Sequence, residues 1–437
     1  MAYPMLVDPA KNAWLIPFSI ILLPAFLGIF IGMTTYISML LSRSEMQLVF
    51  IFPVIWVFIE WVRGSIFTGF PWNLIGYSFT NLITISQTAS IVGVYGLSLL
   101  AVSLCVSFSL LGSTKKINLL LPVMFTILFG VIHLLGSDKL NNSINEYKSI
   151  KIRLVQANIL QNEKWLDEFR NNNFMKHYNL SKSDNIENVD LIIWPETALT
   201  FTSPEKISNR KEMQDILDNG ALLLSGMPRV IIDEDKNIDL YNSIVVFDKA
   251  LDILDSYDKV HLVPFGEYLP FRNILDYLGF SKLVFGEVDY SKGNGPKTIR
   301  LGKLPGFSPL ICFEIIFPGK VIDPNDRPEW LISISNDAWF GNYAGPWQHF
   351  EMARIRSIEE GLPLVRVSNT GISGVIDSYG RILKLIPYGE SGVLDHYLPA
   401  SLPSTLYSRF GDIIVFTIGI LIISFVFLWQ LIRKISN

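Results

Sequence analysis

The sequence predicts an integral membrane protein with a large α/β domain outside the bilayer. Half of its 437 residues are hydrophobic and only 17% are charged, whereas about a quarter are charged in soluble domains. Uncharged stretches occupy residues 12–42, 66–114, 117–137 and 413–432. A helix of about 20 apolar residues is long enough to cross a bilayer. Residues 138–410 instead carry the charges, turns and mixed strand and helix patterns of a layered α/β domain.

We expect five membrane-spanning helices, four before the α/β domain and one after it. The first is not a cleaved signal peptide, because its apolar run is too long. The apolar stretch "FTGFPWNLIGYSFT" is broken by glycine and proline, which favours an interfacial loop over a further span. The expected spans lie at about residues 14–41, 46–63, 85–111, 117–136 and 411–433.

The chain divides into a transmembrane bundle at residues 1–137, an outer domain at 138–410, and a C-terminal helix with a short tail at 411–437. Lysine and arginine in short loops favour the cytoplasmic side of a membrane. The loops that contain Arg43 and Lys115 share one side with the C-terminal tail. We therefore expect the outer domain on the opposite, periplasmic face of an inner membrane.

Continuous apolar runs in the outer domain predict buried strands, and amphipathic runs predict helices. Residues 271–290 mix aromatic and charged side chains and suggest a lid that dips into the headgroup layer. A net charge of −4 without a basic stripe argues against a nucleic-acid partner. The predicted strands lie at residues 150–159, 189–197, 221–230, 240–248, 307–314 and 329–337, and the predicted helices at 205–219 and 347–361.

Three reactive or charged residues occur at the ends of strand-like runs, where a buried strand has no need of a polar side chain. Glu196 ends "LIIWPE", Lys259 lies in "DSYDKVHLVPFGEYLPF", and Cys312 follows "SPLI". A thiol with a pKa of about 8.5 needs a base to react as thiolate, and a carboxylate can take its proton. A lysine can stabilise charge that develops on a carbonyl oxygen. Together the residues fit acyl transfer through a thioester, although each alone has an ordinary alternative, such as a buried structural cysteine.

These segments resemble the nitrilase superfamily of carbon–nitrogen hydrolases, and most closely its membrane-bound branch, the bacterial apolipoprotein N-acyltransferases. The resemblance covers nearly the whole chain from residue 45 onwards. It rests on segments that occur in the family's order, between membrane spans. These are "FTGFPWNLIGYS", "WPET", "KVHLVPFGEYLPFR", "CFEIIFPG", "NDAWFG" and "GPWQHFEMARIRSIEEGLPLVRVSNTGISGVID".

The resemblance implies a nitrilase-type αββα sandwich that faces the periplasm on a membrane bundle. The family moves a fatty acyl chain from a phospholipid, usually phosphatidylethanolamine, to an amine. That amine is the α-amino group of the diacylglyceryl-modified N-terminal cysteine of an apolipoprotein, in the last step of lipoprotein maturation. The resemblance implies no metal or other cofactor.

Carried over to the matching positions, the resemblance implies that Cys312 is the nucleophile, Glu196 the base and Lys259 part of the oxyanion site. Four further residues match supporting or pocket positions of the family. Glu267 matches a functional glutamate but could instead bind a backbone amide and hold its own loop. The others are Glu314, Phe313, where the family often has tyrosine, and, by a loose local match, Trp165.

The sequence departs from the family at its N-terminal end, where members commonly have more spans than the four expected here. We interpret the first spans as absent, through a misassigned start, a natural reduction or an incomplete chain. Two competing functions stay open: a membrane-tethered nitrilase-type amidase that uses water, and an inactive scaffold. The spans and the match beyond the three catalytic positions favour the acyltransferase.

Overall fold

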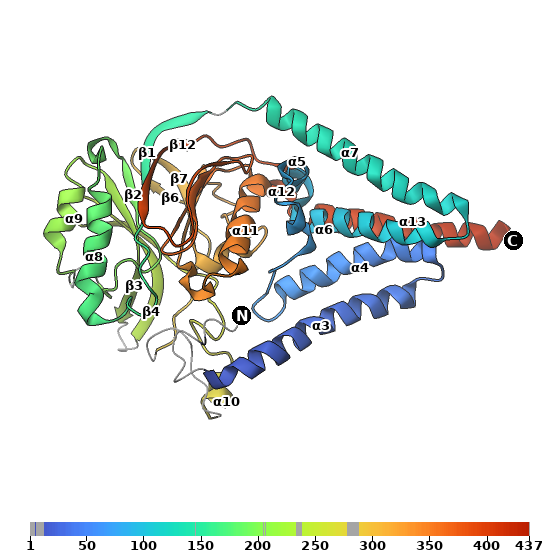
Figure 1. The fold of residues 1–437 in the computed structure, drawn as a ribbon, viewed down its shortest axis with the longest axis horizontal. Helices are drawn as coiled ribbons and strands as arrows, with labels where there is room; N and C mark the ends of the chain where they lie inside the picture. The colour runs from blue at the N-terminus through green and yellow to red at the C-terminus, as the bar shows by residue number, and fades with distance from the viewer. Residues whose placement is uncertain are drawn as a thin grey trace.

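Two six-stranded sheets pack face to face at the centre of the outer domain (Figure 1). The computed structural model describes Met5 and residues 13–144, 146–203, 205, 207–232, 238–277 and 288–436. The first sheet contains, in spatial order, β12 (Gly392–Pro399), β1 (Tyr147–Gln156), β2 (Leu191–Ile193), β3 (Leu222–Ile232), β4 (Ile238–Phe247) and β5 (Ile253–Asp258). The second contains β11 (Ile382–Ile386), β10 (Ser373–Ile376), β9 (Leu364–Ser368), β8 (Trp330–Ser335), β7 (Leu304–Ile311) and β6 (Ile299–Leu301).

Each sheet is parallel at its centre and antiparallel toward its edges. Strands β1, β2 and β3 run parallel in the first sheet, and β7, β8 and β9 run parallel in the second. Because the carboxyl ends of parallel strands meet at one edge of a sheet, that edge is where polar residues after the strands gather. Glu196 follows β2 and Cys312 follows β7, so the topology brings residues from both sheets to this edge.

The layers of the outer domain are helix, sheet, sheet and helix, which confirms the expected αββα sandwich. Apolar side chains from both sheets, such as Ile193 and Ile334, fill the space between them. Helices α8 (Asp167–Ser181) and α9 (Arg210–Ile216) cover the first sheet. Helix α11 (Ala344–Glu360) covers the second sheet, and its Ile355 and Ile358 pack against the membrane bundle on its other side.

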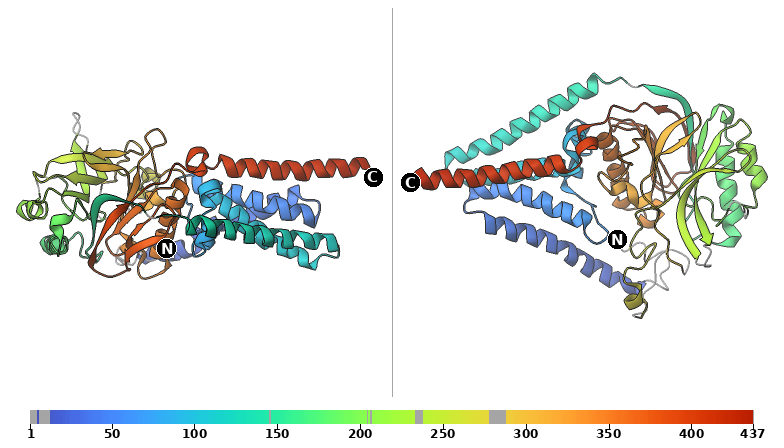
Figure 2. Two further views of the ribbon diagram at one scale, coloured as in Figure 1. Left: turned by 90° about the horizontal axis from the view of Figure 1, so that it is seen from above. Right: turned by 180° about the vertical axis from the view of Figure 1, so that it is seen from behind.

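The five expected spans are confirmed: among the described residues, five helices are long and apolar enough to cross a membrane. Figures 1 and 2 show them extending from one side of the outer domain, beyond α11. They are α3 (Ile16–Leu41), α4 (Glu45–Ser65), α6 (Ala89–Ser107), α7 (Leu120–Asn141) and α13 (Ile413–Ser436).

Several expected boundaries in the outer domain were wrong. The strand expected at residues 189–197 is only β2, because the chain turns sharply after Ile193 to place Glu196. The helix expected at 205–219 is the shorter α9, and α8 and the strands β5, β6 and β9 to β12 were not foreseen. These strands are short and several are half-exposed, so their apolar pattern is weak. Of the expected lid at 271–290, residues 278–287 lie outside the described residues.

The stretch expected as an interfacial loop, residues 67–80, is not one of the five candidate spans, and half of its residues are buried between the bundle and the outer domain. It contains turns and the short helix η2 (Ile75–Phe79), and Trp72 within it is buried. Trp72 belongs to the same apolar cluster as α11 residues such as Phe350. The loop therefore forms part of the contact between the two halves of the molecule.

A kink in α6 forms a second part of that contact. Gly93 has φ 66° and ψ −176°, and the backbone N–H of Val94 donates to Oε1 of Glu359, from α11, at 2.8 Å. A Cβ atom on Gly93 would lie 2.2 Å from the ring of Tyr407. The kink therefore needs glycine, both for its backbone conformation and for the space that Tyr407 occupies.

We expect Gly93→Ala to destabilise the protein by at least about 2 kcal/mol, because it combines a forbidden backbone conformation with a clash. The measurement is the thermal midpoint of the detergent-purified protein. Gly130→Ala is the matched control, because Gly130 lies in α7 with nothing within 4 Å of its added Cβ. Equal midpoints for the two variants would contradict this account of the kink.

Candidate active site

Cys312 lies at a sharp turn where β7 ends and the short helix η7 (Cys312–Ile316) begins. Its φ is 52°, a left-handed conformation that few residues other than glycine adopt. The residue is half-buried. Backbone strain of this kind persists only where surrounding contacts hold it, and it is typical of functional sites.

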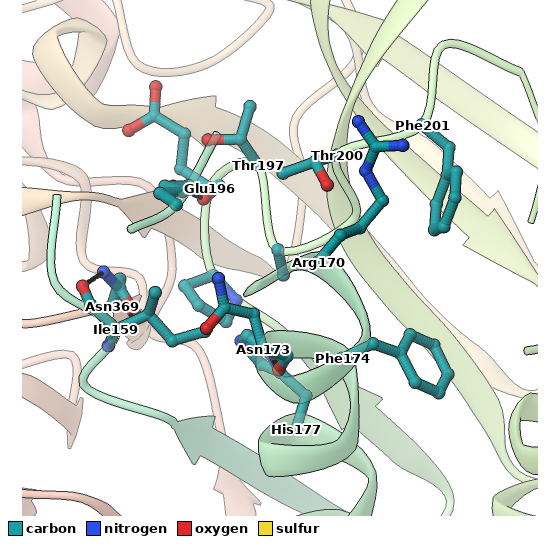
Figure 3. A pocket seen from close by; sticks show the side chains of 13 residues that line it. Ile159, Arg170, Asn173, Phe174, His177, Glu196, Thr197, Thr200, Phe201 and Asn369 are labelled. Carbon is teal, nitrogen blue, oxygen red and sulfur yellow. Dashed lines mark hydrogen bonds between the residues drawn. The ribbon is translucent and has the colours of Figure 1, made fainter. Parts of the chain in front are cut away.

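Glu196 is buried at the start of a turn after β2, and its neighbour Thr197 also has a positive φ, of 48°. Asn242 of β4 donates from Nδ2 to Oε1 of Glu196 at 2.8 Å. Lys164 donates from Nζ to the backbone carbonyl of Glu196 at 2.8 Å. Figure 3 shows Glu196 on one side of a small pocket and Asn173 of α8 on the other. Side chain and backbone of Glu196 are thus both held.

Lys259 follows β5, and only 1% of its side chain is exposed. Its Nζ lies 2.9 Å from Oε2 of Glu267 and 3.9 Å from Oε1 of Glu196. Asn242 bridges the two carboxylates, since its Nδ2 also donates to Oε1 of Glu267 at 2.9 Å. The backbone N–H of Val263 donates to Oε2 of Glu267 at 2.8 Å. Glu267 therefore both pairs with Lys259 and holds its own loop, so the two interpretations of this residue are compatible.

Glu314 joins the turn of the cysteine to the loop of the lysine. Its Oε2 accepts from the backbone N–H of Ile311 at 2.7 Å. Its Oε1 accepts from the hydroxyl of Tyr257 at 2.8 Å and from the backbone N–H of Val260 at 2.7 Å. Glu314 is buried, so these bonds are shielded from water. They position two of the expected catalytic residues relative to each other.

The two aromatic residues expected near the pocket, Phe313 and Trp165, are not among the residues that line the small pocket beside Glu196. Phe313 is half-buried, and its ring centroid lies 5.8 Å from that of His261 and 5.1 Å from that of Phe317. Trp165 is half-buried and directly follows Lys164, the residue that contacts the Glu196 backbone. Contact of either aromatic side chain with a substrate stays a prediction.

The charges around Cys312 keep its thiol protonated. The pKa of the Cys312 thiol is raised to about 12, chiefly by burial and then by the carboxylate of Glu196, against the opposing charge of Lys259. Burial alone lowers the pKa of Lys259, but the carboxylates of Glu267 and Glu196 outweigh it and raise that pKa above its ordinary value. Lys259 is therefore a permanent cation beside a neutral thiol. Such a thiol reacts fast only when a base removes its proton, and the role of Glu196 as that base stays a prediction.

Three residues that hold this site were not foreseen from the sequence. They are Asn242, which bridges the two carboxylates, Lys164, which holds the Glu196 backbone, and His349, whose ring bonds the Cys312 carbonyl. For Asn242 the sequence offered one weak indication of a role, because its amide interrupts the apolar strand run "LYNSIVVF". Lys164 and His349 are ordinary in their local sequence, since nothing there shows that either side chain is buried.

Comparison with known proteins identifies the class of the outer domain. Residues 151–403 match the family described as carbon-nitrogen hydrolase. Residues 4–107 match the N-terminal domain family of apolipoprotein N-acyltransferases.

Full-length relatives agree with both matches. The chain is 35% identical to the apolipoprotein N-acyltransferase of Rhodopseudomonas palustris over 94% of its own length and 79% of the relative's. It is 39% identical to that of Rickettsia bellii over 97% and 84% of the respective lengths. The chain therefore belongs to the apolipoprotein N-acyltransferase family. It also shows a distant structural similarity to an amidase from Nesterenkonia sp., at 17% identity and a TM-score of 0.42 over 62% of this chain and 97% of that one.

The electrostatics of the thiol predict opposite effects of one substitution on two rates. In Glu196→Gln the negative charge beside Cys312 is lost, so the pKa of the thiol falls toward its ordinary value. We expect alkylation of Cys312 by iodoacetamide at fixed pH to become at least about threefold faster, because the thiolate fraction grows as the pKa falls. Enzymatic turnover should fall at the same time, because the base is gone. An alkylation rate equal to that of wild type would show that the Glu196 carboxylate does not influence the thiol.

Proposed function

We propose that this protein transfers a fatty acyl chain from a phospholipid, through a thioester on Cys312, to the α-amino group of a diacylglyceryl-modified apolipoprotein. The observation that carries the proposal is the position of Cys312, at a strained strand end beside the ion pair of Lys259 with Glu267 and the carboxylate of Glu196. Membership of the apolipoprotein N-acyltransferase family supports the choice of substrates. The five candidate spans support a multi-pass membrane protein.

The first half-reaction acylates the cysteine. Glu196 takes the thiol proton while Sγ of Cys312 attacks the ester carbonyl of the phospholipid. Lys259 stabilises the negative charge on the carbonyl oxygen in the tetrahedral intermediate. When the intermediate collapses, the ester C–O bond breaks, and the protonated Glu196 gives its proton to the departing lysophospholipid alkoxide. The products are the thioester and a carboxylate on Glu196, ready for the second step.

The second half-reaction transfers the acyl chain to nitrogen. The neutral α-amine of the acceptor attacks the thioester carbonyl, and Glu196 takes a proton from that nitrogen. The C–S bond then breaks, the amide forms, and the proton on Glu196 returns to the Cys312 thiolate. The high pKa of this thiol favours its reprotonation, because burial and the Glu196 carboxylate disfavour the free thiolate. Water in place of the amine would give the amidase-type hydrolysis that is the competing function.

Both substrates of this reaction are anchored in a bilayer. Moving a fatty acyl chain through water costs about 0.8 kcal/mol per CH₂, so a site beside the membrane avoids most of that cost. We propose phosphatidylethanolamine as the donor, because it is the usual donor of the family that the sequence resembles. The distribution of lysine and arginine in the short loops supports an inner-membrane protein with its catalytic domain in the periplasm.

Intact mass spectrometry tests the proposal directly. After incubation with phosphatidylethanolamine alone, we expect the purified protein to gain the mass of one fatty acyl group, which hydroxylamine removes. Cys312→Ala should show no gain, and Cys105→Ser, the matched control in α6, should behave as wild type. Acyl transfer to a diacylglyceryl lipopeptide should then follow from the isolated acyl-enzyme. Release of free fatty acid in the presence of the lipopeptide would favour the hydrolase, and no acyl gain in wild type would remove the proposal.

Lysine 259 offers a second test, because it has both a structural and a chemical role. Lys259→Met leaves the buried carboxylates of Glu267 and Glu196 without their cation, which costs about 3–5 kcal/mol of stability when a buried pair is broken. We expect a lower thermal midpoint and loss of thioester formation. The control Lys249→Met removes a lysine whose ion pair with Asp218 is exposed, and should change neither. Thioester formation at the wild-type rate in Lys259→Met would exclude this residue from the oxyanion site.

A further inference from the structure

The strained turn of Cys312 is held on both flanks. On the N-terminal side, Glu314 accepts the backbone N–H of Ile311 at 2.7 Å. On the C-terminal side, Nε2 of His349 lies 3.0 Å from the backbone carbonyl oxygen of Cys312. A left-handed non-glycine residue needs such contacts, because its backbone would otherwise relax. His349 comes from α11, the helix between the second sheet and the membrane bundle.

The surroundings of His349 define which nitrogen carries its proton. A carbonyl oxygen only accepts hydrogen bonds, so Nε2 of His349 donates to Cys312. Nδ1 lies 3.0 Å from Nη2 of Arg366 and 2.9 Å from Oδ1 of Asp337, and these two residues pair with each other at 2.9 Å. Burial, and then the charge of Arg366, lower the pKa of His349 against the carboxylate of Asp337, which favours a neutral ring with its proton on Nε2. His349 is thus fixed as a donor to the nucleophile's own backbone.

The loop between the spans α4 and α6 packs directly on this histidine. The ring of Trp72 lies 5.7 Å from that of His349, centroid to centroid, and 5.4 Å from that of Phe340. Its Nε1 donates to Oε1 of Gln348, the residue before His349, at 2.8 Å. Trp72 is only 6% exposed, so these contacts are part of a packed interior. The orientation of His349 therefore depends on a residue of the membrane bundle.

The same loop reaches the other flank of the turn. The backbone carbonyl of Thr68 lies 2.6 Å from Nε2 of His261. The His261 ring stacks on Phe317 at 3.7 Å, and its backbone N–H donates to Oε1 of Glu314 at 3.1 Å. Glu314 is the residue that holds the N-terminal side of the cysteine turn. One loop of the bundle therefore contacts the supports of both flanks.

We infer that residues 67–80 of the membrane bundle complete the active site, by holding the nucleophile turn of Cys312 through His349 on one flank and His261 on the other. His349 and Trp72 are positioning residues in this account, since neither is required to touch the substrate. The inference rests on the proposed role of Cys312 as nucleophile. It goes beyond that role because it assigns part of the catalytic geometry to a segment outside the carbon–nitrogen hydrolase domain.

The decisive comparison is between two amides at position 349. The amide nitrogen of glutamine can take the place of Nε2 and donate to the Cys312 carbonyl, whereas asparagine is one bond too short. We expect His349→Asn to slow thioester formation with phosphatidylethanolamine vesicles about tenfold, with KM unchanged, since one hydrogen bond to a strained turn is lost. His349→Gln should stay within about threefold of wild type. All variants carry Cys105→Ser, so that Cys312 is the single thiol.

Alkylation of Cys312 by iodoacetamide across about pH 7–10 supplies a readout that does not depend on the acyl transfer reaction. We expect the Asn variant to differ from wild type in this pH profile and the Gln variant to match wild type. His396→Gln is the control, because His396 is a half-buried histidine on the edge strand β12, where its ring packs on Tyr147. Its profile should equal that of wild type.

The outcomes separate this inference from the proposed function. If wild type takes no acyl group but the Asn and Gln variants still differ in alkylation, the proposed function fails and the positioning role stands. If both variants match wild type in both assays, the positioning role is wrong, whatever the acyl transfer shows. Should the Asn variant fail to accumulate, Trp72→Leu carries the test: we expect a similarly slowed thioester formation, and a wild-type rate in Trp72→Leu overturns the inference.

Discussion

The buried carboxylate of Glu314 is the interaction on which the site most depends. Its two oxygens accept backbone hydrogen bonds from Ile311, before the cysteine, and from Val260, after the lysine. These segments belong to different sheets of the sandwich. A buried carboxylate left without such donors would be costly, so the protein gains stability only when both segments are in place. The contacts that join the two sheets at this point are therefore also contacts that hold the site.

Two buried carboxylates at the site surround one buried cation. Lys259 lies between the carboxylates of Glu267 and Glu196, which Asn242 also bridges. Glu267 lies 2.9 Å from the lysine and Glu196 lies 3.9 Å from it, which supports our proposal that Glu196 is the carboxylate that exchanges a proton with Cys312. Two glutamates of similar chemistry thus receive different tasks, because their distances from the cation differ. The neutral resting thiol follows from the same arrangement.

The membrane bundle and the outer domain pack against each other through a shared interior. Helix α11 packs on the second sheet with one face and on the bundle with the other. Glu359 at its end accepts the backbone N–H of Val94 at the kink of α6, and Trp72 packs on His349 near its start. The spans and their loop therefore contact both ends of α11, the helix whose His349 bonds the carbonyl of Cys312.

The sequence by itself determined the membrane character, the five spans and the α/β class, since long apolar runs are local features. It also singled out Glu196, Lys259 and Cys312, as reactive side chains after strands, and their catalytic roles stay a prediction. Only the tertiary structure decided what holds those residues. The contacts of Asn242, Lys164 and His349 join segments distant in the chain, and no local pattern encodes such pairs. Burial of the loop at residues 67–80 was missed for the same reason: a broken apolar run suits a membrane surface and a domain contact equally well, and the partner that covers it is α11.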